Sequence, residues 1–111
     1  MKNIYTPDRC DVVWIDLNPS AGHEQAGRRP AFVISPKQYN SKVGLAIFCP
    51  ITSQPKNYPF EVNIPEGLKI SGVILADQIK NLDWKIRDVK FICKLSSEIF
   101  EEVKIKYNTL V

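Results

Sequence analysis

Leu45-Ala46-Ile47-Phe48-Cys49-Pro50-Ile51 is a nearly all-apolar segment in the middle of the 111-residue chain. A run of this length suits a strand, and because its residues do not alternate with polar ones, both faces of the strand should be covered. Thr52-Ser53-Gln54 follows the segment directly and ends its apolar character. We therefore expect a buried central strand in a β-rich fold.

Shorter runs of the same character lie on both sides of this segment, and clusters of Pro, Gly, Asn and Ser separate them. β-branched and aromatic residues are frequent in the runs, as they are in strands. Pro30, near the beginning of the second run, suits a strand start or a sheet edge. The predicted strands are residues 11–17, 29–34, 45–51, 60–64, 72–76 and 89–95, with residues 77–80 continuing or following the fifth.

Two of these predicted strands alternate between apolar and polar residues. Residues 60–64 alternate cleanly, so one face of that strand should contact water. In the last strand, Val89, Phe91, Cys93 and Leu95 occupy alternate positions. We expect these four side chains to face the core of a half-buried strand.

The hydrophobic period changes to that of a helix after Ser96. Ser96 suits an N-cap, acidic residues follow in the first turns, and lysines lie further along. Apolar residues then recur at helical spacing, at Ile99, Phe100, Val103, Tyr107 and Leu110. The sequence therefore predicts one mainly β domain spanning residues 1–111, a small barrel or bent sheet closed by a C-terminal amphipathic helix.

The composition is that of a soluble globular protein, with 44% hydrophobic and 24% charged residues. A net charge of +3 permits a polyanionic ligand without demanding one. A chain of this size buries a modest core, so dimerisation would add to its stability. We find no signal peptide and no apolar stretch long enough to span a bilayer, and we expect a cytoplasmic protein without a membrane partner.

The cysteines argue against a metal centre. Cys10, Cys49 and Cys93 lie far apart, form no CxxC pair, and are accompanied by a single histidine, His23. Zinc sites need more ligands at closer spacing, so we expect no metal and no cofactor. Each cysteine lies in or beside an apolar run, where it should behave as a small buried hydrophobe in a reducing cytoplasm.

The most unusual part of the chain is the polar loop between the first two predicted strands. It concentrates His23, Glu24, Gln25, Arg28 and Arg29 within a few residues, and two glycines give its backbone freedom. Functional groups gather on loops that rigid elements hold, so this loop is a candidate site. The alternative is an ordinary solvated loop.

A second candidate is the polar cluster Thr52-Ser53-Gln54 at the end of the central strand. Two hydroxyls at a strand end can bind a phosphate oxygen. They can equally form a common hydroxyl-capped turn, and the residues alone favour that alternative.

Aromatic residues near lysines form a third, weaker candidate. Tyr58 and Trp84 lie in the sequence near Lys56 and Lys80, a combination that suits single-stranded RNA through stacking and attraction to the backbone. In a small β protein such aromatics are more often core residues. Asp77, after the fifth predicted strand, could orient a basic residue or cap a bend.

Several segments together resemble the MazF/PemK toxins. The run Gly22-His23-Glu24-Gln25-Ala26-Gly27-Arg28-Arg29-Pro30-Ala31 is similar to the GxEQxGxRP signature of that family. The resemblance covers essentially the whole chain with nearly constant spacing. Its other parts are Asp11, Trp14 and Asp16 as D-x-x-W-x-D, Asn18-Pro19, Ile34–Pro36, Tyr39-Asn40, Pro50–Ser53, Tyr58–Val62 and Gly72–Gln78.

The resemblance implies an SH3-like small barrel of the MazF/PemK/CcdB-like kind with a C-terminal helix. It implies a homodimer that binds RNA along its interface groove and cleaves single-stranded mRNA sequence-selectively, without a metal or a ribosome. It further implies a type II toxin–antitoxin system, in which a cognate MazE-like antitoxin would silence the enzyme by placing an acidic, flexible tail in that groove.

The resemblance also assigns roles to individual residues. Arg29 and Thr52 match the family's catalytic pair, Glu24 matches its loop glutamate, and His23 matches a histidine of the PemK branch. Two positions depart from the family pattern. Arg28 stands where some members have histidine, and a leucine, Leu75, stands where the PemK branch has a catalytic arginine.

The second departure makes a positioning or structural role more fitting for Asp77 than a catalytic one. In metal-free cleavage the neighbouring 2′-hydroxyl attacks phosphorus, which leaves a 2′,3′-cyclic phosphate and a 5′-hydroxyl. The reaction needs a base, an acid and a cation. Arg29 suits the cation, Glu24 or His23 the base, and Thr52 a hydrogen-bond donor to the phosphate.

Ser53 or Gln54 would assist Thr52, while Gln25 and Arg28 are further candidates for catalysis or RNA binding. The competing class is a non-catalytic CcdB-like toxin that binds and inhibits a protein target such as gyrase, since the same small barrel serves both. The co-occurrence of Glu24, Arg29 and Thr52 favours the enzyme, because a pure binding module has no need of that combination.

Overall fold

A mainly β architecture with a C-terminal helix is present in the computed structural model, which describes residues 5–17 and 28–111. The described elements are β1 (Asp11–Asp16), β2 (Arg28–Val33), α1 (Lys37–Val43), β3 (Leu45–Thr52), β4 (Glu61–Asn63), β5 (Val73–Leu75), β6 (Lys80–Asp83), the 3₁₀ helix η1 (Lys85–Arg87), β7 (Lys90–Lys94) and α2 (Ser97–Asn108). The expected fold class is confirmed. In the described part of the chain the strands form an open path rather than a closed barrel, because β4 and β7 end it without pairing to each other.

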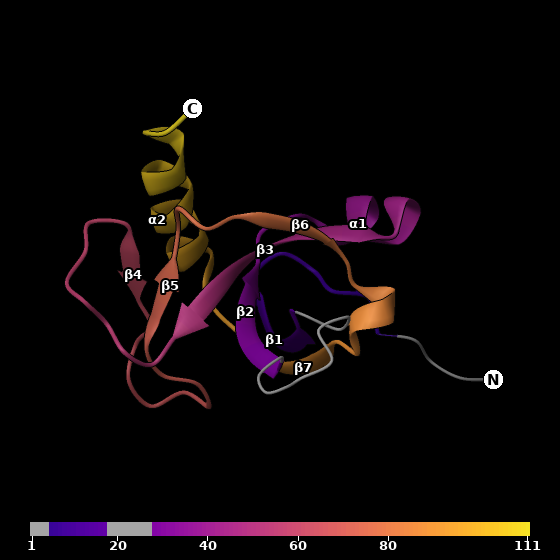
Figure 1. Cartoon of the computed structure of the whole chain (residues 1–111), viewed down its shortest axis with the longest axis horizontal. Coiled ribbons are helices and arrows are strands. Elements are labelled where there is room, and N and C mark those ends of the chain that lie inside the picture. Colours follow the sequence, from indigo (N-terminus) through magenta and orange to yellow (C-terminus); the bar gives the residue numbers. More distant parts are fainter. Residues whose placement is uncertain (1–4, 18–27) are drawn as a thin grey trace.

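Strand β3 is the centre of this arrangement, and all pairings are antiparallel. One edge of β3 pairs with β2, while β6 pairs with its first half and β5 with its last two residues. Figure 1 shows β3 running from α1 past β2 toward β5. The strand therefore belongs to both halves of a strongly bent sheet.

Two apolar clusters cover the two faces of the sheet, and β3 contributes to both. Cys49 and Ile51 lie in one cluster, which α2 covers with Ile99 and Val103. Phe48 lies in the other cluster together with the indole of Trp84. The prediction that residues 45–51 are covered on both faces is thereby confirmed.

Helix α2 begins where the sequence predicts. The Ser96 hydroxyl accepts a hydrogen bond from the Ile99 amide at 3.4 Å, so Ser96 is the N-cap. Ile99 and Val103 are the buried residues of the helix, one turn apart on a single face. Among the described residues, no helix is long and apolar enough to cross a membrane.

Strand β7 differs from the prediction because it contains a β-bulge. Val12 pairs with Cys93 but the next residue, Val13, pairs with Phe91, so Ile92 is an extra residue on β7. The bulge shifts the alternation, and Ile92 packs against the core beside Cys93. Phe91 is 51% exposed, against the expectation that it faces the core. Its ring meets that of Tyr5 edge-on at 5.9 Å.

Helix α1 and strand β6 were not predicted. Only one residue of α1, Asn40, is buried, so the helix has no apolar stripe for a pattern to reveal. The residue after the helix, Gly44, adopts a left-handed φ of 81°, and its amide donates to the Asn40 carbonyl. Strand β6 is polar along most of its length, and its pairing with β3 defines it.

Asn40 holds α1 in place through a buried hydrogen-bond network. Its amide group donates to the carbonyls of Pro7 at 2.8 Å and Ser35 at 3.0 Å, and its side-chain oxygen accepts from the Ser35 hydroxyl at 2.6 Å. The Asn40 carbonyl also accepts from the Trp84 indole at 3.0 Å. One fully buried amide therefore links the N-terminal segment, α1 and the second apolar cluster.

The three cysteines are free thiols, and two of them are buried as the sequence predicts. Cys10 and Cys49 are buried, and Cys93 is intermediate. Burial raises the pKa of the Cys49 thiol to about 12, because a buried thiolate loses its hydration. Cys49 is thus a structural thiol rather than a nucleophile.

We predict that Asn40→Ala lowers the free energy of unfolding by about 3 kcal/mol, because it leaves buried carbonyl and hydroxyl groups without partners. Chemical denaturation followed by tryptophan fluorescence measures the change. Asn63→Ala, at an exposed asparagine of β4, is the matched control and should stay within about 0.5 kcal/mol of the parent chain. Equal stability of the two variants would contradict the role given to the network.

Candidate functional site

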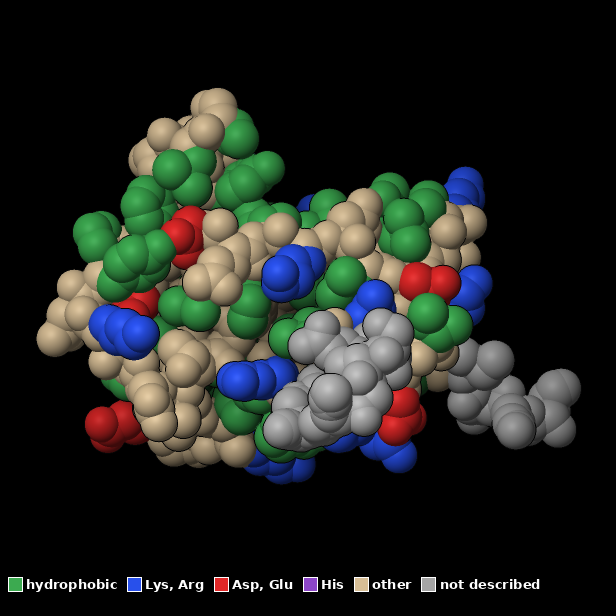
Figure 2. Space-filling view, in the orientation of Figure 1, with side chains coloured by type: hydrophobic (Ala, Val, Ile, Leu, Met, Phe, Trp, Pro, Cys, Tyr) green, Lys and Arg blue, Asp and Glu red, His purple; other side chains and the backbone are tan. Residues whose placement is uncertain are grey.

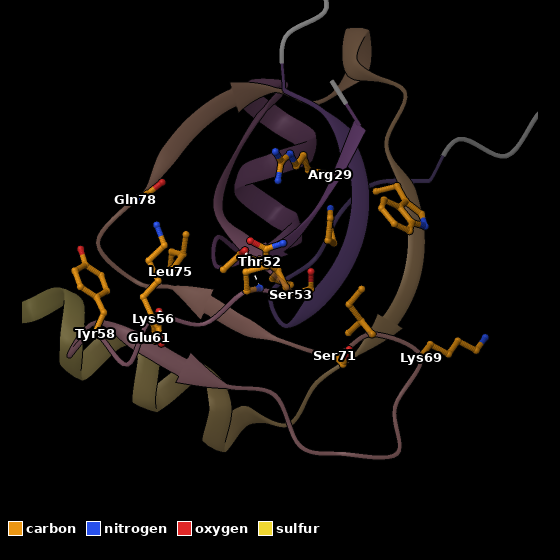
Figure 3. Close-up of a pocket in the computed structure, with 15 residues that line it drawn as sticks. Arg29, Thr52, Ser53, Lys56, Tyr58, Glu61, Lys69, Ser71, Leu75 and Gln78 are labelled. Atoms are coloured by element: carbon orange, nitrogen blue, oxygen red, sulfur yellow. Dashed lines mark hydrogen bonds between the residues drawn. The ribbon is translucent and has the colours of Figure 1, made fainter. Parts of the chain in front are cut away.

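A pocket of about 920 Å³ opens where β3 leaves β2 and turns toward β5. Figure 3 shows Arg29 and Thr52 near its centre. Its lining residues are Trp14, Arg29, Pro30, Ile51, Thr52, Ser53, Gln54, Lys56, Tyr58, Glu61, Lys69, Ile70, Ser71, Leu75 and Gln78. The pocket is therefore built from both halves of the bent sheet and from the loops around β4.

The opening between β2 and β3 lies beside a proline, Pro30, which has no N–H to donate. The Ile34 amide donates to the Ile47 carbonyl at 2.9 Å, and alternate residues of a strand face the same neighbour. By this alternation Pro30 would be a donor toward β3, but proline has no N–H. The pairing of β2 with β3 ends one residue earlier, at Ala31 and Pro50. The structure thus places Pro30 inside β2, at the point where its pairing with β3 stops.

Arg29 and Thr52 lie on the two strands that border this opening. The β2–β3 pairing ends at Ala31 and Pro50, and Arg29 and Thr52 lie two residues beyond that pair on their strands. Arg29 is exposed and Thr52 half-buried. The two residues that the sequence singles out from distant segments therefore line one pocket.

The Thr52 hydroxyl already takes part in a turn. It accepts a hydrogen bond from the Gln54 amide at 3.2 Å, as in the hydroxyl-capped turn that was the alternative explanation of this segment. Accepting that bond leaves the hydroxyl hydrogen able to donate to a ligand. Ser53 and Gln54 are exposed on the same pocket. The two explanations are compatible.

Gly72 fixes the backbone of Thr52, and the sequence analysis gave it no such role. Its φ is 120°, and a Cβ at this position would lie 2.2 Å from the Thr52 carbonyl oxygen. A side chain there would collide with backbone, which cannot rotate away. The available signal was an isolated glycine at the start of a predicted strand, which often marks a close backbone approach.

Tyr58 and Asp77 form a pair at the edge of the pocket. The Tyr58 hydroxyl donates to Oδ2 of Asp77, and this bond is the main cause that raises the pKa of the phenol. The Tyr58 ring also meets Phe60 edge-on at 6.0 Å. Oδ1 of Asp77 is buried and has no hydrogen-bond partner among the described residues. Asp77 therefore orients the Tyr58 ring, while Tyr58 itself lines the pocket.

The charge of the lining is positive. Three cations, Arg29, Lys56 and Lys69, stand against one carboxylate, Glu61. Glu61 accepts a hydrogen bond from the Lys56 amide at 2.8 Å, so it also serves the loop before β4. In Figure 3 the Lys69 side chain lies at the rim and points outward. Such a lining favours an anionic ligand.

Other predicted residues lie elsewhere. Trp84 is 6% exposed in the second apolar cluster, so its assignment to RNA binding is wrong: a ring held in the core cannot stack on a base. Lys80 is exposed on β6 and does not line the pocket. The Arg28 guanidinium contacts Asp88. Residues 23–25, which include Glu24, His23 and Gln25, lie outside the described residues.

Trp14, Lys69 and Gln78 line the pocket but were not predicted as site residues. Trp14 is 39% exposed on β1 and contributes an aromatic face to the pocket. The available signal was the place of Trp14 in the D-x-x-W-x-D segment of the family resemblance. Nothing in the sequence marked Lys69 and Gln78. Within residues 5–17 and 28–111, no three His, Cys, Asp or Glu side chains form a possible metal site.

Comparison with known proteins identifies similar chains. Residues 8–110 match the sequence model of the "PemK-like, MazF-like toxin of type II toxin-antitoxin system". The chain is 42% identical to the endoribonuclease toxin MazF of Escherichia coli K12, over all of this chain and 99% of that one. The crystal structure of Deinococcus radiodurans MazF superposes with a TM-score of 0.88 at 46% identity, covering 96% of this chain and 97% of that one. A D. radiodurans MazE–MazF structure gives a TM-score of 0.86 at 40% identity, covering 96% of each chain.

We predict that Asp77→Ala lowers the pKa of Tyr58 toward the ordinary value for tyrosine, because the phenol then loses the acceptor that holds its proton. The ultraviolet absorbance of tyrosinate, recorded from neutral to alkaline pH, measures this. Subtracting the curve of Tyr58→Phe isolates Tyr58 from the other three tyrosines. An unchanged Tyr58 curve in Asp77→Ala would show that the pair does not exist in solution.

Proposed function

The chain belongs to the family of PemK-like, MazF-like toxins of type II toxin–antitoxin systems, and from this premise we propose that it cleaves single-stranded mRNA in the pocket that Arg29 and Thr52 line. The chain is an endoribonuclease toxin, like its full-length relatives. The single observation that carries the site assignment is the position of Arg29 and Thr52 on one positively charged pocket.

The proposed reaction uses the neighbouring 2′-hydroxyl of the RNA. Its oxygen attacks phosphorus and gives its proton to a base, and the bond from phosphorus to the 5′-oxygen breaks. The departing 5′-oxygen takes a proton from an acid, so the products are a 2′,3′-cyclic phosphate and a 5′-hydroxyl. Glu24 and His23 are the candidate bases. The reaction needs no metal and no ribosome.

Arg29 stabilises the extra negative charge on the phosphorane. Its planar fork can hold two phosphate oxygens at once, which a lysine cannot do. Thr52 lies opposite and donates its hydroxyl hydrogen to a third oxygen. Ser53 and Gln54 assist from the turn that follows.

The aromatic and basic residues of the lining bind the rest of the strand. Trp14 and Tyr58 are part-exposed rings on which unpaired bases can stack. Lys56 and Lys69 attract the phosphates. Gln78 and Ser71, which also line the pocket, offer hydrogen bonds to base edges, so we expect selectivity for a short motif, and an ACA-like motif is the first to test.

The D. radiodurans relative forms a MazE–MazF complex. By analogy, a MazE-like antitoxin inhibits this chain, and the charge of the pocket suits an acidic, flexible antitoxin tail that competes with RNA. The active form is a homodimer in the cytoplasm, where mRNA is available. Figure 2 shows Lys and Arg side chains spread over the face turned to the viewer, a distribution that suits an extended polyanion.

Inhibition of a protein target such as gyrase is not favoured. That function needs only a complementary surface, whereas the pocket brings a guanidinium and a hydroxyl together. Purified protein with naked RNA and excess chelator tests the choice. Cleavage that leaves 5′-hydroxyl ends supports the endoribonuclease, whereas intact RNA and a stable complex with gyrase would support the inhibitor.

We predict that Arg29→Ala lowers the cleavage rate about 10²–10³-fold, the usual effect of removing one preorganised charge contact. Arg29→Lys should also be poor, because a point charge does not replace the fork. Single-turnover cleavage of a short RNA measures both. Lys42→Ala, which removes a cation of α1, is the control of equal charge. An Arg29→Ala variant with most of the parent rate would remove Arg29 from the mechanism.

We predict that Gly72→Ala lowers the cleavage rate roughly 10- to 100-fold, because the new methyl group displaces the Thr52 backbone. Gly67→Ala is a matched control. Gly67 also has a positive φ, of 91°, but a Cβ there meets nothing within 4 Å. The control therefore carries backbone strain without the collision. Equal rates for the two variants would mean that the position of Thr52 does not limit cleavage.

A further inference from the structure

The turn formed by η1 and Asp88 lies against the ends of β1 and β2. Figure 1 shows η1 as the orange coil next to β7. The Arg87 guanidinium donates from Nη1 to the carbonyl of Asp16 at 3.1 Å and to that of Leu17 at 3.0 Å. These carbonyls are at the carboxyl end of β1. Arg87 therefore holds the last residues of that strand.

The next residue, Asp88, contacts β2 through Arg28. Nη1 of Arg28 donates to the Asp88 carbonyl at 3.1 Å and to the Asp88 carboxylate at 3.3 Å. Asp88 can offer both acceptors to one nitrogen because its backbone is left-handed, with a φ of 51°. That conformation is uncommon outside glycine, although aspartate tolerates it better than most residues.

These contacts clamp the end of the ladder that carries Arg29. The register pairs Asp16 with Arg28 and Ile15 with Arg29, which are the last two rungs of β1 and β2. On the other side of β2, pairing with β3 has already stopped at Ala31. The backbone of Arg29 is therefore held by β1 alone, and the clamp secures that attachment.

We infer that Arg87 and Asp88 are positioning residues for Arg29, and that Arg28 acts as their tether rather than as a contact to RNA. The inference rests on the proposed function, since it concerns the orientation of the catalytic guanidinium. The turn at residues 85–88 holds the two strand ends together, and this fixes the direction in which Arg29 enters the pocket.

Stability alone does not account for these residues. The Arg28–Asp88 ion pair is well exposed, at 39% and 70% of the two side chains, and exposed pairs contribute little to folding. Nε of Arg87 is buried without a partner among the described residues. An apolar side chain would fill that place with less loss of hydration. The two carbonyl contacts need a donor at this place, which an apolar side chain does not supply.

The competing explanation is that Arg28 binds an RNA phosphate directly. A phosphate contact raises KM and reduces the salt dependence of binding when it is removed. Loss of Asp88 would then leave cleavage unchanged or improve it, because Arg28 would be released toward the RNA. The tether instead predicts that loss of either partner has the same consequence.

A double-mutant cycle of Arg28→Gln and Asp88→Asn separates the two explanations. Asparagine also tolerates the left-handed backbone, so the turn keeps its shape. We expect each single variant to lower the single-turnover cleavage rate about 3- to 10-fold with KM and salt dependence unchanged. The double variant should be no slower than either single one. Lys42→Gln controls for the loss of one charge.

Arg87→Lys and Arg87→Met extend the test to β1. Lysine can reach a carbonyl as a point charge, so it should restore part of the rate that methionine loses. Additive losses in the cycle, a raised KM for Arg28→Gln alone, or parent rates in all variants would overturn the inference. If the Arg87 variants do not fold, the double-mutant cycle of Arg28 and Asp88 decides between the two explanations.

The outcomes also separate this inference from the proposed function. A parent chain that does not cut RNA would overturn both. If the parent chain cuts RNA and the cycle is additive, the endoribonuclease stands and only the tether is wrong.

Discussion

The missing N–H of Pro30 is the constraint on which the pocket depends. A strand with an unbroken set of donors would continue its pairing with β3 past Ala31 and Pro50, and the space between Arg29 and Thr52 would close. Pro30 offers β3 no donor and the β2–β3 pairing ends at Ala31 and Pro50, while the other edge of β3 pairs with β5 over its last two residues. The guanidinium of Arg29 and the hydroxyl of Thr52 line the pocket at this point, and Gly72 packs closely against the Thr52 backbone.

The strands could be predicted because their apolar character is local. The run at residues 45–51 needed no knowledge of its neighbours to indicate a strand covered on both faces. Helix α1 escaped prediction because Asn40 holds it through buried polar contacts with residues distant in sequence, which no hydrophobic period reveals. The exposure of Phe91 was not predicted, because an alternation pattern does not show that a β-bulge adds Ile92 to the strand.

The candidate site was predictable in part. The assignment of Arg29 and Thr52 came from the family resemblance, and the residues alone left both segments open to ordinary structural explanations. Trp84 was misassigned because an aromatic near lysines has the same appearance whether its ring is buried or exposed. Trp14, Lys69 and Gln78 come from three segments that approach only when the sheet bends, so their common location depends on tertiary structure.

The three thiols differ in how far they are buried. Their alkylation can therefore show which part of the sheet opens. Cys49 lies on β3 with no exposed surface, so an alkylating reagent reaches its thiol only when the central strands separate. Cys93 lies beside the bulge of β7, at one end of the strand path, and is less shielded. The order in which the two thiols are alkylated distinguishes fraying of an edge strand from rupture of the centre of the sheet.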